Sequence, residues 1–143
     1  MRAAAKGLRQ RVGHRGTALL IFALVDMVYA HALLFPSRQA RRSDLLAFLA
    51  DLFPLWVWAL AWGLVGLTCV VEAFRYRDAI GFGAAISIKV MWATVAFGGW
   101  LFGGVDRGQV TAVVWIGFAG LVAVIAHWPE PPRGWKERGW TSH

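Results

Sequence analysis

A chain of 143 residues could form one soluble domain, but 58% of these residues are hydrophobic, nine are tryptophan and only 16% are charged. That balance excludes a mostly water-facing surface and predicts an integral membrane protein. The formal net charge of +7 does not indicate nucleic-acid binding, because the basic residues flank hydrophobic runs and no nucleic-acid module is present. Anionic lipid headgroups are the expected partner of these charges, with no nucleic-acid partner.

The chain begins with a basic tail, residues 1–16, which holds five arginines or lysines and no acidic residue. An apolar run over 17–35 follows and is long enough to cross a bilayer. Thr17 is the expected N-cap of this first span, and Pro36 ends it.

A cleavable signal peptide is the alternative interpretation of this first span. The basic start, the apolar run and the small-residue pattern Ala30-His31-Ala32 are all typical of one. Asp26 interrupts the apolar region that such a peptide needs, and the run continues past the expected cleavage site to Phe35. We therefore expect a retained span.

Residues 43–53 predict a short amphipathic helix. Its apolar side chains share one face, whereas Asp44 and Asp51, seven residues apart, share another. This helix is too short to span a bilayer, so it is expected to lie in the membrane interface. The alternative is that it extends the next span, but Pro54 marks a break.

Three further apolar runs cover 54–74, 79–104 and 109–128. Short charged turns separate them, which indicates antiparallel neighbours. A tail rich in proline and tryptophan, 129–143, is basic and suits the headgroup layer. The predicted fold is all-α: a polytopic membrane protein with four transmembrane helices in an antiparallel bundle and one short interfacial helix.

The basic residues also predict the orientation. Ten of them lie in the two tails and the second connection, whereas four lie in the first and third connections. Lysine and arginine concentrate on the cytoplasmic side of membrane proteins. We therefore expect a multi-pass protein of the bacterial inner membrane with both termini in the cytoplasm.

Lys89 lies about ten residues into the run 79–104, where insertion of a lysine costs roughly 2.5–3.5 kcal/mol. Asp26 lies at a matching depth, since each group is about 13–15 Å from the start of its helix. Both helices leave the same membrane face in the predicted topology, so the two side chains can meet, with Tyr29 as a further hydrogen-bond donor. Three interpretations stay open: a structural tie, a proton or ion relay, or no contact, with Lys89 reaching a membrane interface.

Small residues surround these polar positions and favour close helix packing. The Lys89 face carries Gly81, Ala85, Ala93 and Ala96, and Gly99-x-x-x-Gly103 follows on the same run. His31 completes the set of intramembrane polar residues. It lies about 140° around the helix from Asp26 and suits an interfacial hydrogen bond better than a pH switch.

No catalytic or metal-binding arrangement is predicted. The four histidines, His14, His31, His127 and His143, are scattered singly without ligand spacing. Ser87 and Thr94 flank Lys89, but they lie about 160° and about 140° around the helix from it, so neither can be activated by it. We expect no cofactor, no metal and no enzyme activity.

The pattern His14-Arg15-Gly16-Thr17, followed by Leu19-Leu20, Asp26 and Tyr29, resembles small four-span membrane proteins of actinobacterial phages and prophages. The resemblance covers the first span and the overall plan of the chain. It implies a holin-like or host-membrane-modifying role and transfers no functional residue.

These observations favour a non-enzymatic membrane protein that forms homo-oligomers or binds a membrane-protein partner. The alternative is a small transporter or channel that uses Asp26, Lys89 and His31. A membrane enzyme subunit is a third possibility.

Overall fold

A computed structural model describes residues 2–75 and 78–129. This part of the chain consists of helices and irregular connections and contains no strand. Its elements are α1 (Arg2–Leu34), the short 3₁₀ helix η1 (Ala40–Arg42), α2 (Asp44–Leu52), α3 (Leu55–Ala73), α4 (Ala79–Phe102) and α5 (Gly108–Ala126). Gly13–Leu34 of α1 and the whole of α3, α4 and α5 are long and apolar enough to span a membrane. The predicted all-α polytopic architecture is confirmed. The tail over 130–143 lies outside the described residues.

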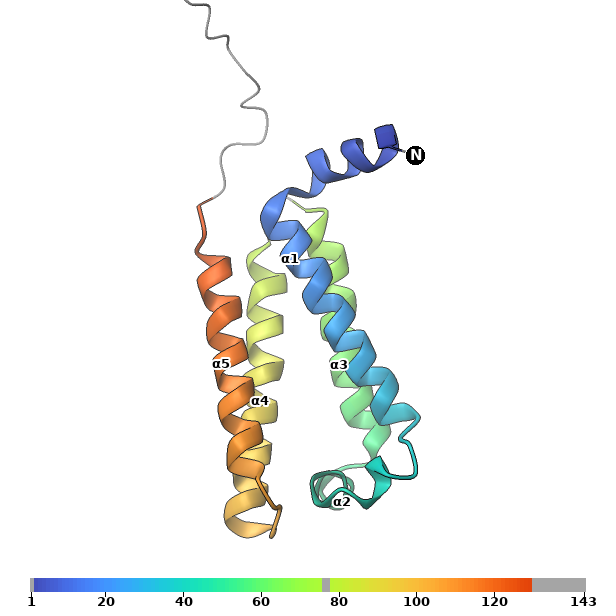
Figure 1. Ribbon diagram of the computed structural model, residues 1–143, viewed down its shortest axis with the longest axis vertical. Helices are drawn as coiled ribbons and strands as arrows, with labels where there is room; N and C mark the ends of the chain where they lie inside the picture. Colours follow the sequence, from blue (N-terminus) through green and yellow to red (C-terminus); the bar gives the residue numbers. More distant parts are fainter. Residues whose placement is uncertain (1, 76–77, 130–143) are drawn as a thin grey trace, which may run out of the picture.

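The first span begins earlier than the sequence predicts. Helix α1 continues back to Arg2, with one non-helical residue at Gly13 (φ 63°, ψ −179°). Glycine tolerates a positive φ because it has no Cβ, so the chain can turn there, and the helix before Gly13 bends away from the bundle (Figure 1). Thr17 is not an N-cap: it lies inside the helix, and its hydroxyl donates to the Gly13 carbonyl over 2.8 Å.

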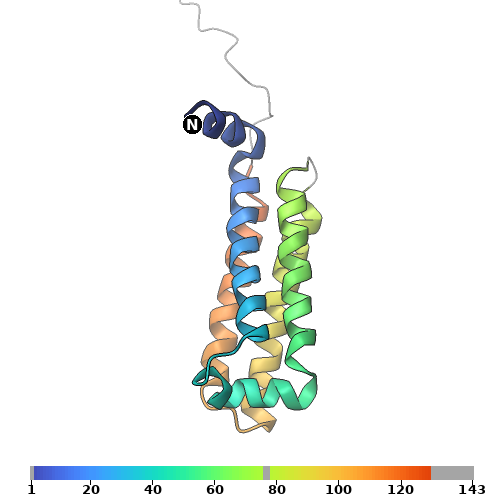
Figure 2. The same cartoon turned by 90° about the vertical axis from the view of Figure 1, so that its right-hand side faces the viewer.

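The four spans form two antiparallel hairpins. Helices α1 and α3 make the first hairpin, and α4 and α5 make the second (Figure 1). The span of α1 begins and α5 ends at one end of the bundle, which we call the terminal end; α2 lies across the opposite end, the α2 end (Figure 2). Helices α1 and α4 therefore run parallel to each other.

Helix α2 closes the α2 end of the bundle. Leu49 is fully buried, and the indole N–H of Trp58 donates to its carbonyl over 3.1 Å. The Phe48 ring lies over Gly99 and Gly103: a Cβ added at Gly103 would come within 2.5 Å of it, and one added at Gly99 within 3.0 Å. The Gly99-x-x-x-Gly103 pattern thus does receive a helix, but that helix is α2 and not another span.

The outer surface of the bundle is apolar. Large hydrophobic side chains on all four spans are more than half exposed, among them Leu24, Leu64, Ile80 and Val113. A water-soluble protein would bury such residues, whereas lipid tails solvate them. Two charged residues of the spans, Asp26 and Lys89, are instead fully buried inside the bundle.

Candidate functional site: a buried ion pair at the centre of the bundle

Asp26 of α1 and Lys89 of α4 form an ion pair inside the bundle. The Lys89 Nζ donates to the Asp26 Oδ1 over 2.8 Å, and both side chains are 0% exposed. A charge-assisted hydrogen bond of this length is among the stronger ones in proteins. Each charge offsets part of the desolvation that the other suffers on burial.

Aromatic rings from the other helices enclose the Lys89 ammonium. It lies 5.9 Å from the ring centroid of Phe22, 5.5 Å from Trp62 and 5.2 Å from Phe118. The negative faces of aromatic rings attract a cation at such distances. These rings belong to α1, α3 and α5, so all four spans contribute to the surroundings of one ammonium group.

The pair does not use all of its hydrogen-bonding capacity. Within the described part of the chain, the Asp26 Oδ2 and the Trp62 indole Nε1 are buried and have no hydrogen-bond partner. One is an acceptor and the other a donor. The centre can therefore form further hydrogen bonds at these two atoms.

An aromatic layer lies next to the pair on the side of the α2 end. It takes one ring from each span: Tyr29, Trp62, Trp92 and Trp115. Tyr29 stacks on Trp62 with centroids 4.7 Å apart, and it meets Trp115 edge-on at 5.0 Å. The hydrogen bond that the sequence suggests from Tyr29 to the pair is absent among the described residues, so Tyr29 contributes through its ring.

His31 lies outside this centre. It is exposed on the outer face, where its ring is 5.1 Å from that of Phe35. It also lines a groove of about 560 Å³ between α1 and α3. Of the four polar residues singled out from the sequence, the structure therefore brings Asp26, Lys89 and Tyr29 together and leaves His31 apart.

The small residues predicted on the Lys89 face are buried. Ala85 is 0% exposed and Ala93 is 2% exposed. At Gly81 an added Cβ would come within 2.9 Å of the Glu72 Cβ, so α3 and α4 approach each other closely there. The Cys69 thiol also donates to the Gly81 carbonyl over 3.5 Å. These residues therefore let α4 pack tightly enough to keep Lys89 enclosed.

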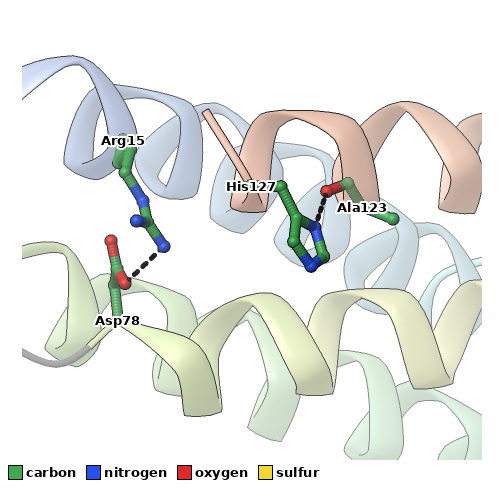
Figure 3. A network of polar contacts seen from close by, with 4 residues as sticks. All are labelled: Arg15, Asp78, Ala123 and His127. Atoms are coloured by element: carbon green, nitrogen blue, oxygen red, sulfur yellow. Dashed lines mark hydrogen bonds and ion pairs between the residues drawn. The ribbon is translucent and has the colours of Figure 1, made fainter. Parts of the chain in front are cut away.

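A second ion pair joins α1 to the residue before α4 at the terminal end, and the sequence reasoning missed it. Arg15 donates to Asp78 over 2.8 Å, as Figure 3 shows; the same view includes the hydrogen bond between the His127 ring and the Ala123 carbonyl. Both ion pairs join residues 63 apart in the sequence. Parallel helices in register keep such a separation constant, so the pairing of Asp26 with Lys89 could have predicted this one.

Within residues 2–75 and 78–129, no group of three or more histidines, cysteines or acidic residues could hold a metal ion. Four apolar helices around an enclosed ion pair define the chain as a multi-pass integral membrane protein. Comparison with known proteins found no matching family model and no significant match among curated proteins or solved structures.

Proposed function

We propose that this chain is a non-enzymatic protein of the bacterial inner membrane that self-associates or binds a membrane-protein partner. The Asp26–Lys89 pair then serves as a structural tie between the two hairpins. A buried ion pair is best attested as a device that fixes which surfaces meet and in which register.

The enclosure of Lys89 carries this proposal. Its side chain is 0% exposed, with Asp26 at 2.8 Å and three rings within 6 Å of its nitrogen. A pair that conducts or relays ions needs water or further titratable groups that connect it to the two membrane faces, as along proton and ion pathways. A site packed with aromatic carbon favours a tie over a relay.

The charge distribution supports the proposed setting. The terminal end carries the basic tail, which would place it on the cytoplasmic side, against anionic headgroups. The resemblance of the first span to phage and prophage membrane proteins adds a more specific hypothesis, a holin-like or host-membrane-modifying role.

Co-expression of two copies with different tags tests self-association. If copies associate, detergent extracts carry both tags through a purification on either one, and extracts mixed after separate expression do not. Membrane potential recorded after induction separates the roles: abrupt depolarisation followed by lysis supports a holin-like protein. Copies that never co-purify, with no partner captured by in-membrane cross-linking, would refute the proposal.

A small transporter or channel is the second candidate. The two buried atoms without partners, Asp26 Oδ2 and Trp62 Nε1, favour it, because they leave hydrogen-bonding capacity at the centre of the bundle. Purified protein in liposomes loaded with a pH-sensitive dye provides the test. Proton flux that Asp26→Asn abolishes, while Asp78→Asn leaves it intact, would support this candidate over the structural tie.

A further inference from the structure

The two hairpins are approximate repeats of each other. Helices α3 and α5 have 19 residues each and correspond residue for residue at an offset of 53, while α1 corresponds to α4 at an offset of 63. The 53-residue offset brings identical residues into correspondence at five positions: Val57 and Val110, Ala59 and Ala112, Trp62 and Trp115, Val71 and Val124, Ala73 and Ala126. Repeats related by an axis along the membrane normal are known from transporter folds.

Corresponding residues meet between the hairpins. The Asp26–Lys89 contact sets the 63-residue offset, and Arg15 contacts Asp78 at the same offset. Corresponding rings behave in the same way: Trp62 lies 5.2 Å from Trp115, and Tyr29 lies 5.8 Å from Trp92. Contact between equivalent positions is the mark of a two-fold interface. The bundle is thus built like a dimer of hairpins whose two halves share one chain.

The same correspondence holds for contacts between non-equivalent helices of the two hairpins and for the grooves on the outer surface. Tyr29 meets Trp115 edge-on at 5.0 Å and 88°, and the corresponding pair, Trp92 and Trp62, meets at 5.4 Å and 80°. A groove of about 360 Å³ lies between α4 and α5. Every residue that lines it corresponds to a residue that lines the α1–α3 groove; the six residues are Ala93, Thr94, Phe97, Ala112, Val113 and Ile116. Independent features on both sides of the interface therefore support the repeat.

The charges at the axis make the two hairpins complementary. A first hairpin docked on another first hairpin would bury Asp26 against Asp26, and two second hairpins would bury Lys89 against Lys89. Like charges so placed repel each other strongly, because no water screens them inside the bundle. The Arg15–Asp78 pair imposes the same rule at the terminal end. Only a first hairpin with a second hairpin satisfies both pairs.

We propose that copies of this chain self-associate by exchanging hairpins: the first hairpin of one copy docks on the second hairpin of another through the interface described above. The proposal rests on the self-association put forward under the proposed function and identifies its contact surface. Exchange needs no new complementary surface, because it reuses contacts that already exist within one chain. The exchange would open the five-residue connection between Ala73 at the end of α3 and Ala79 at the start of α4.

Complementation between two charge-reversed chains tests this directly. One tagged copy carries Asp26→Lys, and a differently tagged copy carries Lys89→Asp. Within either chain, positions 26 and 89 then carry like charges. Exchange between the two chains brings opposite charges together at these positions in both of the bundles that form. We expect each variant expressed alone to lose most of its folded, detergent-soluble protein, and co-expression to restore both as a mixed oligomer retained by either tag.

Two controls show whether the restored ion pairs cause that recovery. The double variant Asp26→Lys/Lys89→Asp in a single chain recovers without any partner if the two positions are equivalent. Two differently tagged copies that both carry Asp26→Lys stay lost, because exchange between them restores no pair. Complementation that fails while the double variant folds would overturn hairpin exchange.

A second measurement does not depend on reversed charges inside the bundle. In a Cys69→Ala background, one tagged copy carries Arg15→Cys and the other Asp78→Cys, and a short thiol-to-thiol cross-linker is added to membranes. Exchange predicts a cross-linked product that carries both tags, far more abundant than with two Arg15→Cys copies. Native copies that co-purify without this product would overturn exchange alone, whereas native copies that never co-purify would overturn the proposed self-association as well.

Discussion

Two ion pairs join α1 to the N-terminal half of the second hairpin, and they differ mainly in their exposure to solvent. Arg15–Asp78 and Asp26–Lys89 each have an N–O distance of 2.8 Å, and each joins residues 63 apart in the sequence. Their polarity is reversed, with the cation on the first hairpin in one pair and on the second hairpin in the other. The side chains of the first pair are 24% and 17% exposed, whereas those of the second are both 0% exposed.

Contact geometry alone does not determine how much an ion pair contributes to the stability of a fold. The pair at the terminal end is only partly buried, so a partner left alone there can still reach water, and the loss of this pair should cost little, about 1 kcal/mol. A partner left alone at the bundle centre is shielded from water, and the uncompensated buried charge costs several kcal/mol. The fully buried pair therefore selects which helices can meet, and the partly buried pair reinforces that choice.

Removal of Lys89 is expected to have the largest effect. Lys89→Met leaves the Asp26 carboxylate buried without its partner, which costs about 3–5 kcal/mol in soluble proteins and less where membrane helices repack. Thermal unfolding in detergent would measure it. The matched control is Val90→Met on the same helix, where the native side chain is 40% exposed and the change should be near neutral.

An enlarged residue at Gly103 is expected to rank next. Gly103→Leu drives a side chain into the Phe48 ring and displaces α2, at about 1–3 kcal/mol for overpacking. Limited proteolysis of the α2 segment would report the displacement. Gly98→Leu is the control, because nothing lies within 4 Å of its Cβ position, and equal effects of the two variants would show that α2 does not dock on Gly103.

Trp58→Phe is expected to produce a smaller loss in the same region. It removes the indole donor to the Leu49 carbonyl, a bond worth about 1 kcal/mol, while that carbonyl keeps the Phe53 N–H as a donor. Hydrogen exchange in α2 should accelerate. Trp56→Phe, at a residue 60% exposed, should leave exchange unchanged; acceleration by both variants alike would point to a general loss of aromatic anchoring.

Asp78→Asn is expected to have the smallest effect, at most about 1 kcal/mol, because Arg15 can be hydrated at the terminal end. Salt screens such pairs, so the difference from the native protein should shrink further at high ionic strength. A loss as large and as salt-independent as that of Lys89→Met would show that exposure does not separate the two pairs. The measurement is thermal unfolding in detergent at low and high salt.

The sequence predicts the four spans, the short helix over 43–53 and the depth match of Asp26 and Lys89, because hydrophobic run length, amphipathic spacing and helical rise determine these three features. It does not predict the helix that precedes Gly13, since a positive φ at one glycine joins two helical segments without altering the pattern around them. The sequence also does not determine which helix packs against Gly99 and Gly103. That choice depends on Phe48 reaching it from α2, a tertiary contact.

The internal repeat was hidden for a different reason. Only five of 19 corresponding positions in α3 and α5 are identical, and the connection within the first hairpin, which holds η1 and α2, breaks the common offset. At the axis itself the residues must differ, because opposite charges pair there and equal charges would not. The two ion pairs, which mark the repeat in space, therefore contribute nothing to its sequence identity.

A double-mutant cycle on Asp26 and Lys89 tests the structural tie most directly. Unfolding free energies are measured in detergent for the native protein, Asp26→Asn, Lys89→Met and the double variant. The contact seen at 2.8 Å predicts that each single change destabilises strongly and that the double variant recovers much of the loss, since no lone charge remains. Single effects that simply add, with no recovery in the double variant, would contradict a tie between the two hairpins at this pair.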